Sequence, residues 1–544
     1  MKKNNLFIIV LILGLSIACT NKSIDSVVIN AKIYTVNKDN FIAKSLAINN
    51  GKIIDVSEEN LDKFYKAKSV IDANNRTILP GLIDSHCHFY GLGLDQEVVD
   101  LRETKSLNEI LDRLIEYNNK YDSNVIIGRG WDQNDWKNKD FPLNDKLNEL
   151  FPDKIVVLER VDGHAYFCND FTLIKAGINE TTNLKGGSVI LKNGKPTGVL
   201  VDSPMRMVDR ILPKKNNHEK IRALQKAENI CFSYGLTTVD DAGLNKDIIF
   251  LIDSLNKVDE LKIKIYAMVS ASKENIEFFK NNGKIKTPRL NVRSFKVYGD
   301  GALGSRGAAL KEPYSDDLDN YGKLSTSIDD LEYYSNSIYA MGFQMNTHAI
   351  GDSTIGFLVK NYNKVLENAI DPRWRIEHSQ VVDEIDFPMY NNKILPSVQP
   401  THATSDMYWA DERLGDRISG AYAFKDLLKY SKRIALGTDF PVEKVNPFHT
   451  FYSSVERKDL SGFPDGGFQK TNGLSRTETL KGMTIWGAYF NFEENEKGSL
   501  EIGKSADFIL IDQNIMEIDA DKIPNTQVLK TFIDGELVYQ NDDL

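Results

Sequence analysis

The sequence has few cysteines, no excess of positive charge and no long apolar run after its first twenty residues. It contains 4 cysteines among 544 residues, so it lacks the dense cysteine framework of a disulfide-stapled domain. Its 67 lysine and arginine residues are outnumbered by 77 aspartate and glutamate residues, and the net charge of −10 argues against a nucleic-acid partner. With 41% hydrophobic and 26% charged residues, the composition is typical of a globular enzyme.

The one apolar run that looks like a targeting segment lies at the N-terminus. Lys2 and Lys3 precede the apolar residues 6–18, which are too few to span a bilayer comfortably. The run ends in Ala18-Cys19 and resembles a bacterial lipoprotein signal peptide covering residues 1–19. We therefore expect a lipid anchor on Cys19 that holds the protein to a membrane of the bacterial cell envelope, on the periplasmic or surface side. The alternative is a plain secretory signal that is cleaved near the same point.

Both ends of the remaining chain have a sequence pattern typical of short strands joined by tight turns. Residues 24–80 contain several β-branched runs, and Asn50-Gly51 between two of them is a strong hairpin signal. Residues 495–544 have the same character. We expect these two segments to form one small composite β-sandwich domain.

The middle of the chain, residues 81–494, alternates apolar strands with helical patterns. Eight apolar runs end near His86, Thr238, Val269, Tyr298, His348, His378, Val398 and Thr438. This alternation predicts an α/β fold with a (β/α)8 TIM barrel. The first gap is much longer than one helix, so we expect a large insertion after the first strand, at about residues 89–215.

The first barrel strand ends in the motif His86-Cys87-His88. Side chains two residues apart in a strand point to the same face, so the two imidazoles project side by side and can bind one divalent metal ion. Two ordinary surface histidines are the alternative. Cys87 points to the other face, and we interpret it as a packing residue.

Other expected strand ends carry the same kind of side chain. They offer Lys296, His348, His378 and Asp439. His348 and His378 are 30 residues apart, about one strand–helix unit, and Asp439 follows 61 residues later, about two units. Barrel enzymes carry their chemistry at these ends, and scattered structural histidines have no reason to keep this spacing. The residues therefore predict a metal site at the mouth of the barrel.

With these motifs in place, the chain resembles the amidohydrolase superfamily, and within it the metal-dependent hydrolases of amidohydrolase family 3. The resemblance covers nearly everything after residue 24. Its motifs are Pro80-Gly81-Leu82-Ile83-Asp84-Ser85-His86-Cys87-His88, Gly128-Arg129-Gly130-Trp131-Asp132, Asp162-Gly163-His164, Asp300-Gly301-Ala302-Leu303-Gly304-Ser305-Arg306, His348-Ala349-Ile350-Gly351-Asp352 and Gly437-Thr438-Asp439.

The resemblance implies a role for each strand-end residue. His86 and His88 hold the more buried metal together with Asp439, as the resemblance implies. His348 and His378 hold a second metal, or steady the substrate if one ion is present. Lys296 occupies the place of a lysine that is carboxylated by CO2 and bridges two metals. The alternative for Lys296 is an unmodified lysine that binds a carboxylate. Barrels of this kind also often pair, which makes a homodimer an expectation.

The chemistry of such a site points to hydrolysis of a small-molecule amide at a carbon–nitrogen bond other than a peptide bond. A divalent ion, for which zinc is the expectation, lowers the pKa of water enough to supply hydroxide near neutral pH. Asp439 is then the general base and later the general acid, and His378 or the metal polarises the carbonyl. Two alternatives stay open. One is a non-catalytic surface lipoprotein that uses the barrel as a binding module, and the other is a hydrolase of an ester, a cyclic amide or a dipeptide.

Weaker candidates complete the expected substrate-binding set. They are His164, Trp131, Asp132, Arg306 and His402. For each a structural role is the competing interpretation: a hydrogen bond for His164, core packing for Trp131, and a loop-fixing salt bridge for Arg306. The glycine-rich loop around Arg306 is not followed by GK[ST], which excludes a phosphate-binding P-loop.

Overall fold

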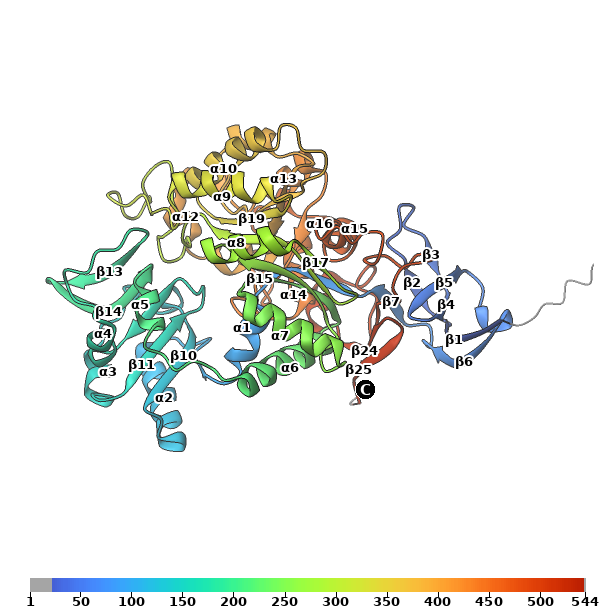
Figure 1. The fold of residues 1–544 in the computed structure, drawn as a ribbon, viewed down its shortest axis with the longest axis horizontal. Coiled ribbons are helices and arrows are strands. Elements are labelled where there is room, and N and C mark those ends of the chain that lie inside the picture. Colours follow the sequence, from blue (N-terminus) through green and yellow to red (C-terminus); the bar gives the residue numbers. More distant parts are fainter. Residues whose placement is uncertain (1–21, 543–544) are drawn as a thin grey trace, which may run out of the picture.

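The computed structural model describes residues 22–542 (Figure 1). The expected signal peptide and Cys19 lie outside the described residues. Among the helices that are described, none combines the length and the apolar character needed to cross a bilayer.

The centre of the molecule is a parallel β-barrel surrounded by helices, which confirms the predicted TIM barrel. Within residues 22–542, eight parallel strands follow one another in the order β8, β15, β16, β18, β19, β20, β21 and β22. Their bounds are β8 (Leu82–Cys87), β15 (Leu236–Leu244), β16 (Lys264–Ser270), β18 (Leu290–Tyr298), β19 (Gln344–Ala349), β20 (Trp374–His378), β21 (Ile394–Val398) and β22 (Ala435–Leu436).

One strand is longer than its apolar run. We expected the second strand to end near Thr238, but β15 continues to Leu244. Asp240 and Asp241 interrupt the apolar pattern, yet both are buried, and Asp240 accepts a hydrogen bond of 2.9 Å from Arg375 inside the barrel. A charged residue inside a barrel strand interrupts its apolar run, so hydrophobicity alone underestimates the length of the strand.

Helices cover the outside of the barrel. Their bounds are α6 (Asn217–Ser233), α7 (Lys246–Lys257), α8 (Lys273–Asn282), α9 (Ile328–Ala340), α10 (Asp352–Val365), α11 (Pro400–Asp406), α12 (Ala410–Leu414), α13 (Phe424–Ser431), α14 (Pro447–Glu456), α15 (Arg476–Gly482) and α16 (Ile485–Phe490). Helix α6 begins with a capping box between Asn216 and Glu219, which satisfies two of the unpaired amides at its first turn. Its buried face carries Leu224, Ala227 and Cys231, which join the main hydrophobic core.

Strands from both ends of the chain form a small β-sandwich beside the barrel (Figure 1). One sheet has the order β5 (Lys52–Ser57), β4 (Ser45–Asn49), β1 (Lys22–Ile29) and β6 (Tyr65–Asp72). The other has the order β25 (Glu536–Gln540), β24 (Val528–Ile533), β23 (Phe508–Ile511), β7 (Thr77–Pro80), β2 (Lys32–Tyr34) and β3 (Ile42–Ala43). The Asn50-Gly51 hairpin is confirmed, because both residues have positive φ and Asn49 pairs with Lys52.

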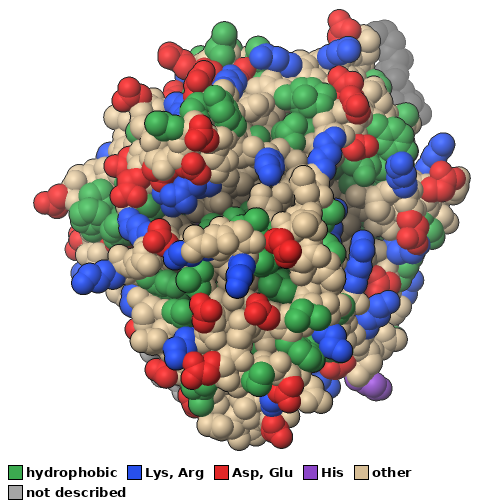
Figure 2. Space-filling model, turned by 90° about the vertical axis from the view of Figure 1, so that its left-hand side faces the viewer, with side chains coloured by type: hydrophobic (Ala, Val, Ile, Leu, Met, Phe, Trp, Pro, Cys, Tyr) green, Lys and Arg blue, Asp and Glu red, His purple; other side chains and the backbone are tan. Residues whose placement is uncertain are grey.

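The segment after the first barrel strand forms a separate layer on one side of the barrel (Figure 1). Helix α1 (Phe89–Asp95) leads into it. Its strands are β9 (Val99–Asp100), β10 (Val125–Trp131), β11 (Ile155–Arg160), β12 (Ala165–Cys168), β13 (Gly187–Lys192) and β14 (Lys195–Asp202). Its helices are α2 (Leu107–Tyr121), α3 (Asp145–Leu150), α4 (Asp170–Ala176) and α5 (Met205–Asp209). Figure 2 views the molecule from this side, where acidic and basic side chains are interspersed with hydrophobic ones.

The barrel closes where its first and last strands meet. The backbone N–H of Asp439 donates to the carbonyl of His86 at 2.8 Å, and the N–H of His88 donates to the carbonyl of Phe440 at 2.8 Å. Below them, the carboxylate of Asp84 accepts a hydrogen bond of 2.7 Å from the hydroxyl of Thr438. These bonds fix the His-x-His motif in register with Asp439.

Candidate active site

Six of the eight histidines of the chain gather at one end of the barrel. The ring centroids of His348 and His378 are 4.5 Å apart, and those of His86 and His378 are 4.7 Å apart. The rings of His88, His164 and His402 lie at 5.8, 5.1 and 6.1 Å from His86, His348 and His378, respectively. The strand-end residues of the prediction are therefore brought together.

His86 is oriented by a buried carboxylate. Its Nδ1 lies 2.6 Å from Oε2 of Glu377, and both side chains are fully buried. A histidine whose Nδ1 donates to a carboxylate keeps the lone pair of Nε2 free for a metal. That Nε2 lies 3.7 Å from Oδ1 of Asp439. Burial and the nearby Lys296 lower the pKa of His86, which favours the neutral, metal-binding form.

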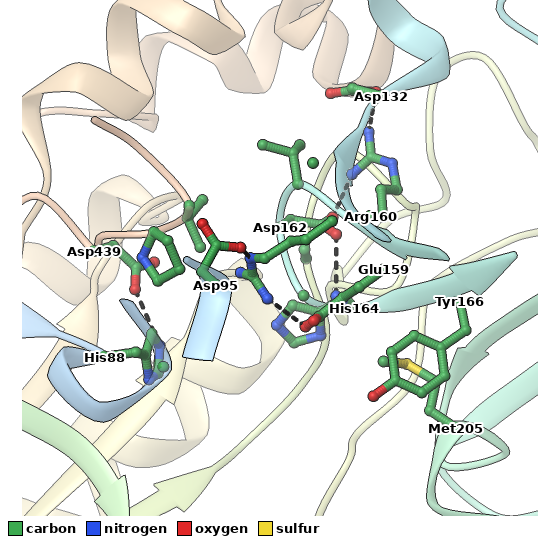
Figure 3. Close-up of a pocket in the computed structure, with 18 of the residues that line it drawn as sticks. His88, Asp95, Asp132, Glu159, Arg160, Asp162, His164, Tyr166, Met205 and Asp439 are labelled. Atoms are coloured by element: carbon green, nitrogen blue, oxygen red, sulfur yellow. Dashed lines mark hydrogen bonds and ion pairs between the residues drawn. The ribbon is translucent and has the colours of Figure 1, made fainter. Parts of the chain in front are cut away.

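His86, His378 and Asp439 form a group that can hold a cation. Each offers one ligand atom, and these atoms all lie within 4.8 Å of one another. His88 stands beside them, with its Nε2 3.2 Å from Oδ1 of Asp439 (Figure 3). Two imidazole nitrogens and one carboxylate oxygen are a donor set that zinc accepts.

The charge states in this group also suit a cation. Burial and the proximity of other histidines hold the pKa of His378 and of His348 well below the usual range. Burial alone would raise the pKa of Asp439, but the neighbouring His88, His86 and His378 hold it well below its usual range. The group therefore combines neutral imidazoles with one anion.

One atom of Asp439 lacks the partner that a buried anion needs. Among the described residues, no side chain or backbone group satisfies hydrogen-bond geometry with its Oδ1, although His88 is close. A buried unpaired carboxylate oxygen is costly. A bound divalent ion removes this cost, so the residues fit a metal.

Lys296 projects into the same group. Its Nζ lies 3.0 Å from Nε2 of His86, and burial lowers its pKa to about 8. An ammonium has no lone pair, so only the neutral amine of Lys296 could bind a metal or attack CO2. His348 stands nearby, and its Nε2 lies 3.4 Å from the carbonyl of Gly301.

His164 reaches the barrel from the insertion. It precedes β12, and its Nδ1 lies 2.7 Å from Oδ1 of Asp202 at the end of β14. Burial alone would lower the pKa of His164, but the charge of Asp202 raises it to about 9. Asp202 packs against a crowded loop, because a Cβ at Gly301 would lie 2.7 Å from its Oδ2 and 3.0 Å from the backbone of Gly307.

The other substrate-binding candidates divide into two pairs. Asp132 and His402 line the cavity of the site. Trp131 and Arg306 are not among the described residues that line it. Trp131 is fully buried in the core of the insertion, and its indole N–H donates to the carbonyl of Leu158 at 2.8 Å. The guanidinium of Arg306 pairs with Asp316 at 2.8 Å, which is the loop-fixing role of the competing interpretation.

Cys87 behaves as expected. It is fully buried, belongs to the main hydrophobic core, and its Sγ lies 3.5 Å from the carbonyl of Asp240.

Three residues that hold the histidines in place were absent from the sequence prediction. Glu377 bonds His86, Asp202 bonds His164, and the side-chain oxygen of Gln399 lies 2.8 Å from Nδ1 of His378. Glu377 directly precedes His378 in a buried strand. A carboxylate inside a buried strand requires a charged or hydrogen-bonding partner. The position of Glu377 in an apolar run could therefore have indicated a partner among the site residues.

The site opens into one large cavity of about 1030 Å³ between the barrel and the insertion. Figure 3 shows His88 and Asp439 on the barrel side and Arg160 and His164 on the insertion side. Arg160 is buried and forms ion pairs with Asp132 and Asp162. The insertion thus supplies a rigid, polar wall opposite the metal ligands.

Solved structures share this architecture over almost the whole chain. An uncharacterized metal-dependent hydrolase from Pyrococcus horikoshii is 26% identical, with a TM-score of 0.73 over 91% of this chain and 99% of the other.

Sequence relatives cover the chain equally well. YtcJ of Bacillus subtilis, which carries the name of an amidohydrolase, is 30% identical over 535 residues, 93% of this chain and 98% of that protein. An N-substituted formamide deformylase from Arthrobacter pascens is 22% identical over 545 residues, 95% of this chain and 98% of that protein. The sequence profile of the amidohydrolase family matches residues 69–539, and the chain belongs to this family of hydrolases.

Proposed function

We propose that the protein is a metal-dependent hydrolase that cleaves the carbon–nitrogen bond of a non-peptide amide. The observation that carries the proposal is the group of His86, His378 and Asp439, with its unpaired carboxylate oxygen, at the base of a large cavity. The similarity to a formamide deformylase supports the choice of bond.

The residues divide the work between holding the metal and moving the proton. His86, His88 and Asp439 would hold the more buried ion, and His348, His378 and a carboxylated Lys296 would hold a second. A divalent ion, with zinc as our proposal, supplies the acidity that activates water and polarises the carbonyl. Asp439 accepts the proton of the attacking water and delivers it to the leaving nitrogen. His378, fixed by Gln399, would steady the substrate if one ion is bound.

The insertion would close the site over the substrate. His164, held by Asp202, and Asp132, held by Arg160, face the barrel residues across the cavity. We propose that His164, Asp132 and His402 contact the substrate. We also propose that the chain is tethered to a membrane through Cys19 and that it forms a homodimer.

The proposal is tested with zinc-loaded enzyme on a panel of amides. The panel holds N-formyl amines, N-acetyl amines, N-acyl amino acids, cyclic amides, dipeptides and esters. We expect metal-dependent release of the amine from at least one non-peptide amide, and loss of turnover after chelation. Turnover of esters or dipeptides alone would overturn the assignment of the bond. A protein that binds no metal after loading would instead favour a binding module.

The role of Asp439 has its own test. We expect Asp439→Ala to lower kcat by about 10²–10⁴-fold, the range for loss of a general acid–base. Asp319→Ala, which removes an exposed carboxylate outside the cavity lining, is the control. Unchanged turnover in an Asp439→Ala protein that retains its metal contradicts the assigned role.

A further inference from the structure

The cavity continues from the metal ligands along one face of the insertion sheet. Strand β10 (Val125–Trp131) runs toward the site. Asp132, which directly follows it, pairs with Arg160, and both residues line the cavity opposite the metal ligands. Alternate residues Val125, Ile127 and Arg129 point to the same face and line the cavity. The opposite face of this strand is covered, because Ile126 packs into the core formed with helix α2.

Apolar side chains from four other places complete the walls. Val98 lies beside Ile127, because Val99 pairs with Gly128 in the neighbouring strand β9. Leu94 comes from helix α1, which begins directly after the metal-site residue His88. Tyr166 on β12 and Met205 on α5 lie together on the insertion side, away from His88 and Asp439 (Figure 3). We call this region the apolar trough and define it as Leu94, Val98, Val125, Ile127, Tyr166 and Met205.

The trough has a definite length and direction. From Arg129 back to Val125 the strand advances by four residue steps, or about 13 Å at roughly 3.3 Å per step. Arg129 lies at the site end and is neutralised by Glu159 at 2.6 Å. At the other end, Glu97 is paired with Lys215 at 3.4 Å. Asp209, which also lines the cavity, accepts a hydrogen bond of 2.9 Å from the hydroxyl of Tyr166. The charged groups at the two ends of β10 thus have partners of their own, and the cavity-facing side chains of β10 between them are hydrocarbon.

We propose that the substrate is an amide with an extended apolar substituent, about 10 Å or more in length, which lies in the apolar trough while the amide is held at the metal site. This inference rests on the proposed function. Its support is the continuity of one cavity from the site into the trough. A hydrocarbon chain gains apolar contact with the half-buried faces of Val125, Ile127 and Tyr166, whereas a polar occupant gains none from them.

A homologous series of substrates tests the inference. N-acetyl n-alkylamines from ethyl to dodecyl vary the amine side, and N-methyl amides of fatty acids vary the acyl side. Burial of a methylene group gives about two- to fourfold in kcat/KM. We expect kcat/KM to rise by this factor per carbon in at least one series, up to a chain of about 8–10 carbons. If kcat/KM does not increase with chain length in either series, the inference is wrong.

Variants locate the effect in the trough. Ile127→Glu is expected to lower the ratio of decyl to ethyl kcat/KM by at least tenfold. Val125→Trp, which fills the distal end, is expected to move the optimum to shorter chains, a result that misfolding does not produce. Leu191→Glu is the matched control, because Leu191 lies in the same sheet, is 44% exposed and is not among the described lining residues. A chain-length dependence that all three variants share with the wild type overturns the inference.

Binding of 1-octanol, which has no amide, separates this inference from the proposed function. We expect calorimetry to show octanol binding to the wild type and at least tenfold weaker binding to Ile127→Glu. If amides are hydrolysed but octanol does not bind, the function stands and the trough assignment fails. If octanol binds as expected but no amide is hydrolysed, the proposed function fails and the apolar site stands.

Discussion

Glu377 and His86 form a hydrogen bond of 2.6 Å between two fully buried side chains that are 291 residues apart in the sequence. The bond leaves Nε2 of His86 facing Asp439. A partner of this kind fixes the orientation of a metal-binding histidine. Glu377 therefore belongs to the candidate metal site through its bond to His86.

Replacing Glu377 should weaken metal binding. We expect Glu377→Gln to lower the affinity for zinc by about 10–100-fold, because the amide holds His86 less firmly and supplies no charge. Competition with a chelator measures this affinity. Glu493→Gln is the matched control, since Glu493 is also buried but pairs with Lys286 and Lys497. Equal affinities in the two variants would contradict the assigned role.

Carboxylation of Lys296 should depend on pH. With its pKa lowered to about 8, the reactive neutral amine rises from roughly one-tenth at pH 7 to about half at pH 8. We expect a carbamate signal in ¹³C NMR after zinc loading with ¹³C-bicarbonate, formed faster at pH 8 than at pH 7. Lys296→Met should lack the signal. A wild type that shows no carbamate at either pH would favour the unmodified lysine.

The buried imidazole of His348 should make the metal-free protein sensitive to acid. Its folded pKa lies well below the ordinary value of 6.5, so below pH 6.5 the unfolded chain binds more protons and acid favours unfolding. We expect the wild type to lose stability relative to His348→Asn as pH falls from 6.5 to 5.0, by up to about 1.4 kcal/mol per pH unit. Urea unfolding at several pH values measures this difference. His218→Asn, at an exposed histidine, is the control, and we expect its free energy of unfolding to follow that of the wild type as the pH falls. If the free energy of unfolding of His348→Asn also follows that of the wild type, the expectation is wrong.

The anchor prediction concerns residues 1–19. We expect Cys19→Ala to move the protein from the membrane fraction to the aqueous fraction, because the lipid-bearing thiol is lost. Fractionation of cells that express either form measures the change. Ser16→Ala, which leaves the cysteine in place, should remain with the membrane. A Cys19→Ala protein that stays with the membrane rules out the lipid anchor.

Much of the fold follows from local patterns, and the exceptions have physical causes. Apolar runs and the Asn50-Gly51 turn predict most strands correctly, because those strands carry their own hydrophobic signal. The end of β15 was missed because Asp240 is satisfied by Arg375, a partner that lies 135 residues away. Long-range pairing of this kind leaves no local trace in the sequence.

The candidate site divides in the same way. Its histidines, Lys296 and Asp439 stand out because their spacing follows the strand–helix unit. The sequence does not predict the roles of Glu377, Gln399 and Asp202, because each role depends on a hydrogen bond to one particular histidine. Trp131 shows the opposite error, since its motif suggests a pocket while its side chain fills a core. The spacing predicts which strand ends meet, but not which way the neighbouring side chains point.

The hydrogen bonds at the barrel seam, from Asp439 to His86 and from His88 to Phe440, also determine at what stage of folding the site can form. These residues follow or end the first and last strands of the barrel, so the contacts join the two ends of the barrel sequence. Contacts of that kind form late, since the loop between them must be ordered first. No fragment that ends before residue 439 contains both sides of the site. Metal binding by His86, His378 and Asp439 would thus require the closed barrel, and an ion bound there would report that its first and last strands have met.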